Sequence, residues 1–206
     1  LSYIGRNMSD KKKRRRIFWR VAAAALALVL VFGLVFWLTL PDVTWLVKKN
    51  PTETAMMKFR AGQARQAGKK ARRYWKRVPL SRISPYLIQA VLIAEDDKFF
   101  EHEGFDWESM RNALEANINK KRVLRGGSTI TQQLAKNLFL TPEKTWERKI
   151  REALLAIQIE KRYTKQEIFT LYANQIYLGH GAYGVEAASR VYFRKSARDL
   201  TIEEAA

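Results

Sequence analysis

The 206-residue sequence contains no cysteine and only two histidines. Without cysteine the chain forms no disulfides, although this leaves its redox compartment open. Two histidines together with carboxylates do not make a Cys/His metal framework, which argues against a structural zinc site. The sequence also lacks Asn-Gly and Asp-Gly turns and any sustained alternation of polar and apolar residues, so that little in it predicts a β-sheet.

Acidic residues are scarce in the first 80 positions. That part has 19 Lys and Arg against 3 Asp and Glu, whereas residues 81–206 have 19 against 17. The formal net charge of +18 therefore belongs to the N-terminal part, and the remainder is nearly neutral. Its length suits one domain with a hydrophobic core. The basic excess adjoins an apolar segment, which argues against nucleic-acid binding.

Residues 21–40 contain no charged side chain. A helix of this length spans about 30 Å, the thickness of a membrane's hydrocarbon core. A buried core helix would show a polar stripe, and a cleaved signal peptide usually has a shorter apolar run. We therefore expect a retained transmembrane anchor. Residues 1–20 hold eight Lys and Arg against four in residues 41–60, which predicts a cytoplasmic N-terminus.

The charge pattern divides the chain into four parts. They are a basic cytoplasmic tail (1–20), the transmembrane anchor (21–40), a basic juxtamembrane connector (41–80) and an extracytoplasmic domain (81–206). Residues 58–77 of the connector hold nine basic residues and no acid. Such a run is attracted to anionic headgroups and would hold the domain near the bilayer. Gly62 and Gly68 argue against one rigid helix there.

Helix-start signals recur after residue 80 and predict a mostly α-helical domain. The signals are Ser84-Pro85, Asp106, Thr141-Pro142, Thr164 with Glu167, and Thr201 with Glu204. The last of them opens a helix only five residues before the sequence ends. We therefore expect the chain to be a C-terminally truncated piece of a longer protein.

An acid-rich segment, AEDDKFFEHEGFD at 94–106, follows the apolar run Leu87–Ala94. The run predicts a buried helix. Acids at the end of a buried helix are costly unless they are paired or take part in chemistry. Single histidines such as His102 are more often structural than catalytic, and His180, in a Gly-rich run, is predicted to lie in a loop.

The helix predicted over Pro142–Arg162 is apolar on two opposite faces. At 100° per residue, one face is formed by Trp146, Ile150, Ala153, Leu154 and Ile157, and we take it as the core face. The opposite face carries Arg148 and Glu152 and is apolar beyond them. Glu152 is therefore expected to be partly desolvated, and two roles stay open for it: an ion pair with Arg148, or chemistry.

The segment RGGSTITQQLAKN, residues 125–137, combines a glycine pair with a capped helix. Gly126 and Gly127 permit close backbone approach, and Ser128 or Thr129 can cap the helix that follows. A Gly-rich turn before a helix N-terminus suits an anion such as phosphate. A plain capped surface helix fits as well, and the order of a P-loop is missing.

Together these stretches resemble the family 51 glycosyltransferases, the peptidoglycan glycosyltransferases, from about Pro51 to Ala206. Five ordered motifs carry the resemblance: Glu95-Asp96-Phe99-His102-Gly104, Gly126–Asn137, Arg148-Lys149-Glu152, Lys165–Gly179 and Gly184–Phe193. The fourth departs from the usual pattern at Phe169-Thr170, and Arg194 follows the fifth where Gly or His is common. Neither departure touches the expected catalytic residues.

The resemblance implies a lysozyme-like, mostly α-helical fold that joins lipid II units into a β-1,4-linked glycan. Inversion at C1 and release of undecaprenyl pyrophosphate would accompany each transfer. Glu95 would be the general base that takes the proton of the acceptor's 4-hydroxyl, and Glu152 would act on the leaving-group side. The residues expected to neutralise the pyrophosphate are Lys136, Arg148 and Lys149. Those expected to shape the pocket are Gln133, Asn137, Gly127, Ser128 and Thr129. Those expected to frame Glu95 are Asp96, Phe99, His102 and Gly104.

The resemblance implies no obligatory cofactor, and leaves open a divalent cation, Mg²⁺ or Mn²⁺, held through Glu152. The expected partners are lipid II, the nascent glycan strand, membrane lipids and other cell-wall synthesis proteins, without nucleic acid. The expected place is the inner (cytoplasmic) membrane, with the domain in the periplasm. Expected membrane contacts in the segment between the first two motifs are Trp107, Met110, Lys120, Lys121 and Arg122.

Two architectures occur among such enzymes, a monofunctional transglycosylase and a bifunctional penicillin-binding protein. Asn50–Arg60 and Arg82–Val91 look more like the monofunctional enzymes. Two other functions stay open on the residues alone. One is a lysozyme-like lytic enzyme that cleaves glycan strands, and the other is a membrane-anchored scaffold without activity.

Overall fold

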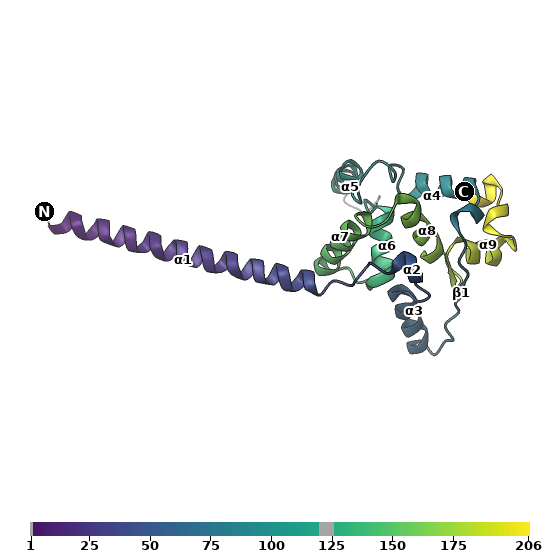
Figure 1. The fold of residues 1–206 in the computed structure, drawn as a ribbon, viewed down its shortest axis with the longest axis horizontal. Coiled ribbons are helices and arrows are strands. Elements are labelled where there is room, and N and C mark those ends of the chain that lie inside the picture. The colour runs from purple at the N-terminus through teal and green to yellow at the C-terminus, as the bar shows by residue number, and fades with distance from the viewer. Residues whose placement is uncertain (1, 120–125) are drawn as a thin grey trace. The chain divides into compact units, whose positions relative to one another are not determined.

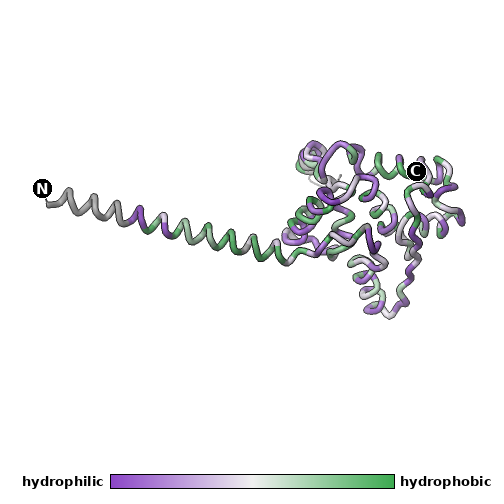
Figure 2. The backbone as a smooth tube through the Cα atoms, in the orientation of Figure 1, coloured by the Kyte–Doolittle hydropathy of each residue, from purple (hydrophilic) through white to green (hydrophobic). Residues whose placement is uncertain are grey.

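A computed structural model describes residues 2–119 and 126–206 and divides the chain into two compact units, Leu1–Pro41 and Asp42–Ala206 (Figure 1). The first unit contains the helix α1 (Ser2–Leu38). Within α1, the 25 residues Arg14–Leu38 are long and apolar enough to cross a membrane, and most of this stretch is green in Figure 2.

The second unit is mostly α-helical, as the capping signals predict. Its helices are α2 (Leu46–Lys49), α3 (Ala55–Gln66), α4 (Pro85–Glu95), α5 (Trp107–Asn119), α6 (Ile130–Phe139), α7 (Trp146–Glu160), α8 (Lys165–Gln175), α9 (Val185–Phe193) and α10 (Ile202–Ala205). Short 3₁₀ turns cover Leu80–Arg82 and Ala197–Asp199. Two-residue strands, β1 (Tyr74–Trp75) and β2 (Ala182–Tyr183), pair in parallel.

Helix α6 is the centre of this unit and packs against α3, α7 and α8. Its apolar residues Ile130 and Leu134 are fully buried, as are Leu155 of α7 and Ile168 of α8. Burying a side chain of this size stabilises the folded state by about 2 kcal/mol. The central helix is therefore buried on most sides, and only a narrow strip with Gln133, Lys136 and Phe139 is partly exposed.

Local capping chemistry fixes most helix starts where the sequence predicts them. Thr164 and Thr201 each form a full capping box, with Glu167 and Glu204. Asp106 caps α5, since its Oδ1 accepts from the backbone N–H of Ser109 at 2.9 Å. Each bond satisfies a backbone donor that the first helical turn leaves without a partner.

Helix α7 differs from the expectation in its start and its orientation. It begins at Trp146 with Thr145 as the cap, so that the predicted start at Thr141-Pro142 is wrong. The predicted core face is also wrong: the side chains of Trp146 and Ile150 are 86% and 51% exposed, whereas the face with Glu152 is buried. Both faces are apolar, so periodicity could not decide which of them α6 would cover.

Helix α4 begins after Ser84, as predicted, but it is not a buried helix. None of its residues is fully buried, and Ile93 is 76% exposed. Ser84 does not cap it, because its hydroxyl donates to the carbonyl of Leu200 at 3.1 Å. Apolar composition predicts burial only if enough neighbours cover a helix. Glu95 therefore stands at the end of a surface helix.

The first half of the basic connector packs into the domain. Leu46 and Met57 are buried, and Thr54 caps α3 by accepting from the N–H of Met57 at 3.1 Å. Gly62 lies inside α3, whereas Gly68 follows its end with a φ of 65°. Such a left-handed residue commonly terminates a helix. Beyond it the chain is extended as far as the 3₁₀ turn that precedes α4.

The buried carboxylate of Glu186 holds the segment that follows α9. It accepts hydrogen bonds from the N–H of Ala197 at 2.8 Å and the hydroxyl of Ser196 at 3.1 Å. Arg190 donates to it at 2.7 Å and Lys76 lies 3.6 Å away. Burial by itself would raise the pKa of Glu186, but these hydrogen bonds outweigh it and bring the pKa below its ordinary value.

Glu186 is therefore expected to make the folded state sensitive to acid. A carboxyl whose pKa is lower in the folded than in the unfolded state stabilises the folded protein. This contribution is fully present above the unfolded pKa, about 4.3, and is lost as pH falls through the folded pKa. We expect Glu186→Gln to lower stability by about 1–3 kcal/mol at pH 7 and to flatten the loss on acidification, measured by thermal melting at pH 7 and pH 3. Glu101→Gln, at an exposed site, serves as the control, and equal acid sensitivity of both variants would contradict the assignment.

Candidate active site

Asp96 joins the acid-rich segment to the N-terminus of α6. Its Oδ2 accepts from the backbone N–H of Ile130 at 2.9 Å, and its Oδ1 lies 2.9 Å from Nε2 of His102. The N–H of Gly104 donates to Nδ1 of His102 at 3.1 Å. Nε2 therefore carries the ring proton and donates it to Asp96. A carboxylate at a helix N-terminus also gains from the helix dipole.

The residues predicted to frame Glu95 surround Asp96 as one packed group. Phe99 is fully buried, with its ring 6.3 Å from that of His102 and 6.2 Å from that of Phe169. Gly104 has a φ of 90°, and a Cβ there would lie 3.0 Å from Cγ of Glu160. Its carbonyl accepts from the hydroxyl of Thr129 at 2.7 Å. The first motif is thus fixed onto the second by short contacts.

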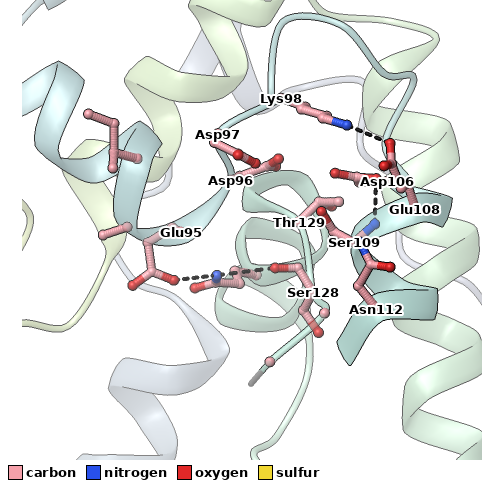
Figure 3. Close-up of a pocket in the computed structure, with 15 residues that line it drawn as sticks. Glu95, Asp96, Asp97, Lys98, Asp106, Glu108, Ser109, Asn112, Ser128 and Thr129 are labelled. Carbon is pink, nitrogen blue, oxygen red and sulfur yellow. Dashed lines mark hydrogen bonds and ion pairs between the residues drawn. The ribbon is translucent and has the colours of Figure 1, made fainter. Parts of the chain in front are cut away.

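Glu95, the neighbour of Asp96, is exposed and carries the one carboxylate of the pair that is available to a substrate. Its Oε2 accepts from Nε2 of Gln133 at 2.8 Å (Figure 3). The hydroxyl of Tyr172 in turn donates to Oε1 of Gln133 at 3.3 Å. This contact orients the amide so that its N–H₂ group faces Glu95.

Tyr172 is the residue that sequence reasoning missed. It lies in the fourth motif, but nothing in its spacing indicates that its hydroxyl reaches Gln133, 39 positions away. Burial raises the pKa of Tyr172, and the negative charges of Glu95 and Asp96 raise it further. The hydroxyl therefore keeps its proton at neutral pH and can donate to Gln133 there.

A cleft of about 430 Å³ lies beside Glu95. Of the predicted pocket residues, those that line it are Gly127, Ser128, Thr129 and Gln133. Gly127 is required by close approach, because a Cβ there would lie 3.1 Å from the backbone of Met110. The lining also includes side chains that the sequence did not indicate: Lys98, Asp106, Glu108, Ser109 and Asn112.

The far wall of the cleft is polar and partly paired (Figure 3). Lys98 donates to Glu108 at 2.6 Å, and this hydrogen bond raises the pKa of Lys98. Burial would raise the pKa of Asp106, but the hydrogen bonds from Ser109 outweigh it and lower the pKa. Oδ2 of Asp106 is buried and has no hydrogen-bond partner among the described residues.

Glu152 is buried and forms ion pairs with both Arg148 and Lys149. Nζ of Lys149 also lies 2.9 Å from the hydroxyl of Ser128, which lines the cleft. The third motif is thereby attached to the Gly-rich turn of the second. The ion pair that the sequence left open is present, with two cationic partners in place of one.

The remaining predicted residues lie farther from the cleft. Lys136 and Asn137 are on α6 and do not line it. Within residues 2–119 and 126–206, the ammonium of Lys136 has no hydrogen bond or ion pair, so it remains available to an anion. Trp107 is 71% exposed, Met110 is half-buried, and Lys120, Lys121 and Arg122 lie outside the described residues. His180 lies in a loop, as predicted.

The described part of the chain offers no group of three or more His, Cys, Asp and Glu side chains arranged to hold a metal ion. The carboxylate of Glu152 fits a divalent cation poorly, since each of its oxygens already contacts a cationic nitrogen. A metal ion at Glu152 therefore has no part in the chemistry proposed below.

The helical domain thus places the exposed carboxylate of Glu95 beside a polar cleft, and Lys149, which shares Glu152 with Arg148, contacts the wall of that cleft at Ser128. The Transglycosylase family model matches residues 62–206. With most of its length covered, the chain belongs to this family, and it is a peptidoglycan glycosyltransferase of cell-wall synthesis.

Curated relatives agree with the family match. The biosynthetic peptidoglycan transglycosylase of Dechloromonas aromatica is 48% identical over 157 residues, covering 76% of this chain and 68% of that protein. The enzyme of the same name from Methylobacillus flagellatus is 42% identical over 192 residues, covering 93% and 82%. That from Aromatoleum aromaticum is 48% identical over 166 residues, covering 80% and 71%.

Replacing Asp96 tests whether its carboxylate joins the two motifs. An amide at this position cannot accept from both Ile130 and His102 without turning its own N–H₂ towards a donor. We expect Asp96→Asn to lower the free energy of unfolding by about 1–3 kcal/mol, the cost of an unsatisfied buried donor. Thermal melting of the full chain in detergent measures this. Asp97→Asn, at the exposed neighbouring position, should stay within about 0.5 kcal/mol; equal losses would show that Asp96 is not special.

Proposed function

We propose that this chain polymerises lipid II into β-1,4-linked glycan with inversion at C1 and release of undecaprenyl pyrophosphate. The observation that carries the proposal is the exposed carboxylate of Glu95, fixed by Gln133 at the edge of the cleft. Glu95 takes the proton of the acceptor's 4-hydroxyl while that oxygen attacks C1 of the donor sugar. The bond from C1 to the pyrophosphate breaks, and its electrons leave with the lipid-linked pyrophosphate.

The leaving group requires positive charge, because negative charge develops on the pyrophosphate in the transition state. Arg148 and Lys149 would supply this positive charge. Both are paired with Glu152, and Lys149 contacts the Gly-rich turn at Ser128. Lys136 adds a cation without a partner among the described residues. In this assignment Glu152 positions two cations and does not itself touch the reacting atoms.

The acceptor would lie along the wall formed by Asp106 and Asn112. This arrangement keeps the acceptor on the side of Glu95 that faces the cleft, opposite the cations of the third motif.

We propose a single-pass orientation with the N-terminus in the cytoplasm and the domain in the periplasm. The apolar stretch Arg14–Leu38 is long enough to span the bilayer, and the basic excess precedes it. Lipid II carries its sugars outside and its lipid in the membrane, so this orientation would place substrate and cleft on the same side.

A lytic enzyme, which would cleave glycan strands, is the alternative function to be distinguished from polymerisation. Such an enzyme needs a desolvated carboxyl that stays protonated until it gives its proton to the leaving sugar. Glu95 is exposed, and exposure suits a base. Incubation with lipid II or with mature glycan distinguishes the two functions by product: polymer in the first case, fragments in the second.

Glu95→Gln is expected to reduce glycan polymerisation by at least 100-fold, the usual contribution of a general base. The substitution keeps size and polarity, so the melting temperature should change little. Gel analysis of polymer from lipid II measures the rate, and Glu103→Gln, at an exposed site in the same segment, is the control. Undiminished polymerisation by Glu95→Gln would overturn the assignment of Glu95 as the base.

Tyr172→Phe tests the orientation of Gln133. Removing the hydroxyl frees the amide to turn its oxygen towards Glu95, and we expect the polymerisation rate to fall about fivefold, equivalent to one hydrogen bond of about 1 kcal/mol. KM should change less than kcat, because the residue acts through Gln133. Tyr86→Phe, on the exposed side of α4, is the matched control, and equal rates for all three proteins would exclude the positioning role.

A further inference from the structure

A second hollow, of about 1060 Å³, shares no lining residue with the cleft. It lies between α3, the extended segment at residues 69–73 and the loop at residues 177–183. Six basic side chains line it against one acid: Arg60, Arg65, Lys69, Lys70, Arg72 and Arg73, against Glu53. We call it the basic hollow. Nothing in the transfer reaction uses it.

The walls of the basic hollow are fixed by backbone contacts. The N–H of Tyr74 donates to the carbonyl of Gly181 at 2.7 Å, and β1 pairs with β2 directly beyond. Gly181 has a φ of 80°, and a Cβ there would lie 2.8 Å from the carbonyl oxygen of Arg72. The basic segment at residues 69–73 is therefore packed against the loop at residues 177–183.

Arg60 provides an unsatisfied donor inside this hollow. Its guanidinium lies 3.8 Å from the centre of the Tyr177 ring, a cation–π contact that fixes its plane. Its Nε is buried and has no hydrogen-bond partner among the described residues. A buried N–H without an acceptor is costly, and a guanidinium fork matches the oxygens of a phosphate.

Four of the other five cations that line the basic hollow lack counter-charges among the described residues. Arg73 is satisfied by the carbonyl of Thr52 and by Glu53. By contrast, Arg65, Lys69, Lys70 and Arg72 form no ion pair within the described ranges. These four cations are therefore available to an anion that enters the basic hollow from outside the chain.

We propose that the basic hollow binds the phosphate of an anionic phospholipid headgroup, with Arg60 as the central ligand. A headgroup is the favoured source because this chain carries its own membrane-length helix, Arg14–Leu38, which keeps the domain at a bilayer surface. The proposal depends on the anchor and not on the transfer chemistry. Its failure would leave polymerisation by Glu95 intact.

The test uses the full chain in nanodiscs of phosphatidylcholine, with or without phosphatidylglycerol. Trypsin cleavage after Arg72 and Arg73, followed by mass spectrometry, reports access to the basic hollow. We expect phosphatidylglycerol to slow this cleavage at least tenfold. A third sample contains neutral nanodiscs and inorganic phosphate at the same concentration. If inorganic phosphate with neutral nanodiscs protects as well as phosphatidylglycerol does, the headgroup is overturned as the source of the phosphate. Equal cleavage in all three samples would overturn the site.

Variants locate the effect. Removing one charge near a headgroup weakens attraction about fivefold, so Arg60→Gln and Lys70→Gln should each need about five times more phosphatidylglycerol for half-protection. Lys161→Gln removes an exposed lysine outside the basic hollow and should change nothing. Lys70 is exposed, so its variant keeps the test valid if Arg60→Gln fails to fold. A shift of the same size in Lys161→Gln would show general attraction to charge and overturn the assigned site.

Discussion

The carboxylate of Asp96 accepts hydrogen bonds from two groups, the ring of His102 six positions away and the N–H of Ile130 at 34 positions. The second of these bonds ties the end of α4 to the first turn of α6, the helix that carries the core. Glu95 is covalently next to Asp96, and Gln133 lies one turn further along α6. The position of Glu95 relative to Gln133 is therefore fixed by the neighbouring carboxylate of Asp96, which is itself buried.

Three carboxylates in the site have different environments, and the environments assign their roles. Asp96 is buried and fully hydrogen-bonded, Glu152 is buried between two cations, and Glu95 is exposed. A buried charge persists only where partners compensate its desolvation. Asp96 and Glu152 are thus held by partners within the fold, and Glu95 is the carboxylate of the three that is exposed to solvent.

The basic surplus of the N-terminal part is also more ordered than its composition suggests. Half of the connector contributes to the core through Leu46 and Met57, and the extended part is held by β1 and β2. In the described part of the connector, positive charge gathers in the basic hollow around Arg60, which shares no residue with the cations Arg148 and Lys149 near Ser128.

What the sequence alone determined is local: the apolar stretch in α1, the caps at Thr164 and Thr201, and the motifs that indicate the family. Capping and hydropathy depend on residues within a few positions, so they can be read without a fold. Tertiary structure decided which face of α7 is covered, that α4 lies at the surface, and that Tyr172 reaches Gln133 and Arg60 reaches Tyr177. These outcomes depend on which distant segments meet, and two equally apolar faces or two distant polar side chains contain no local signal of that choice.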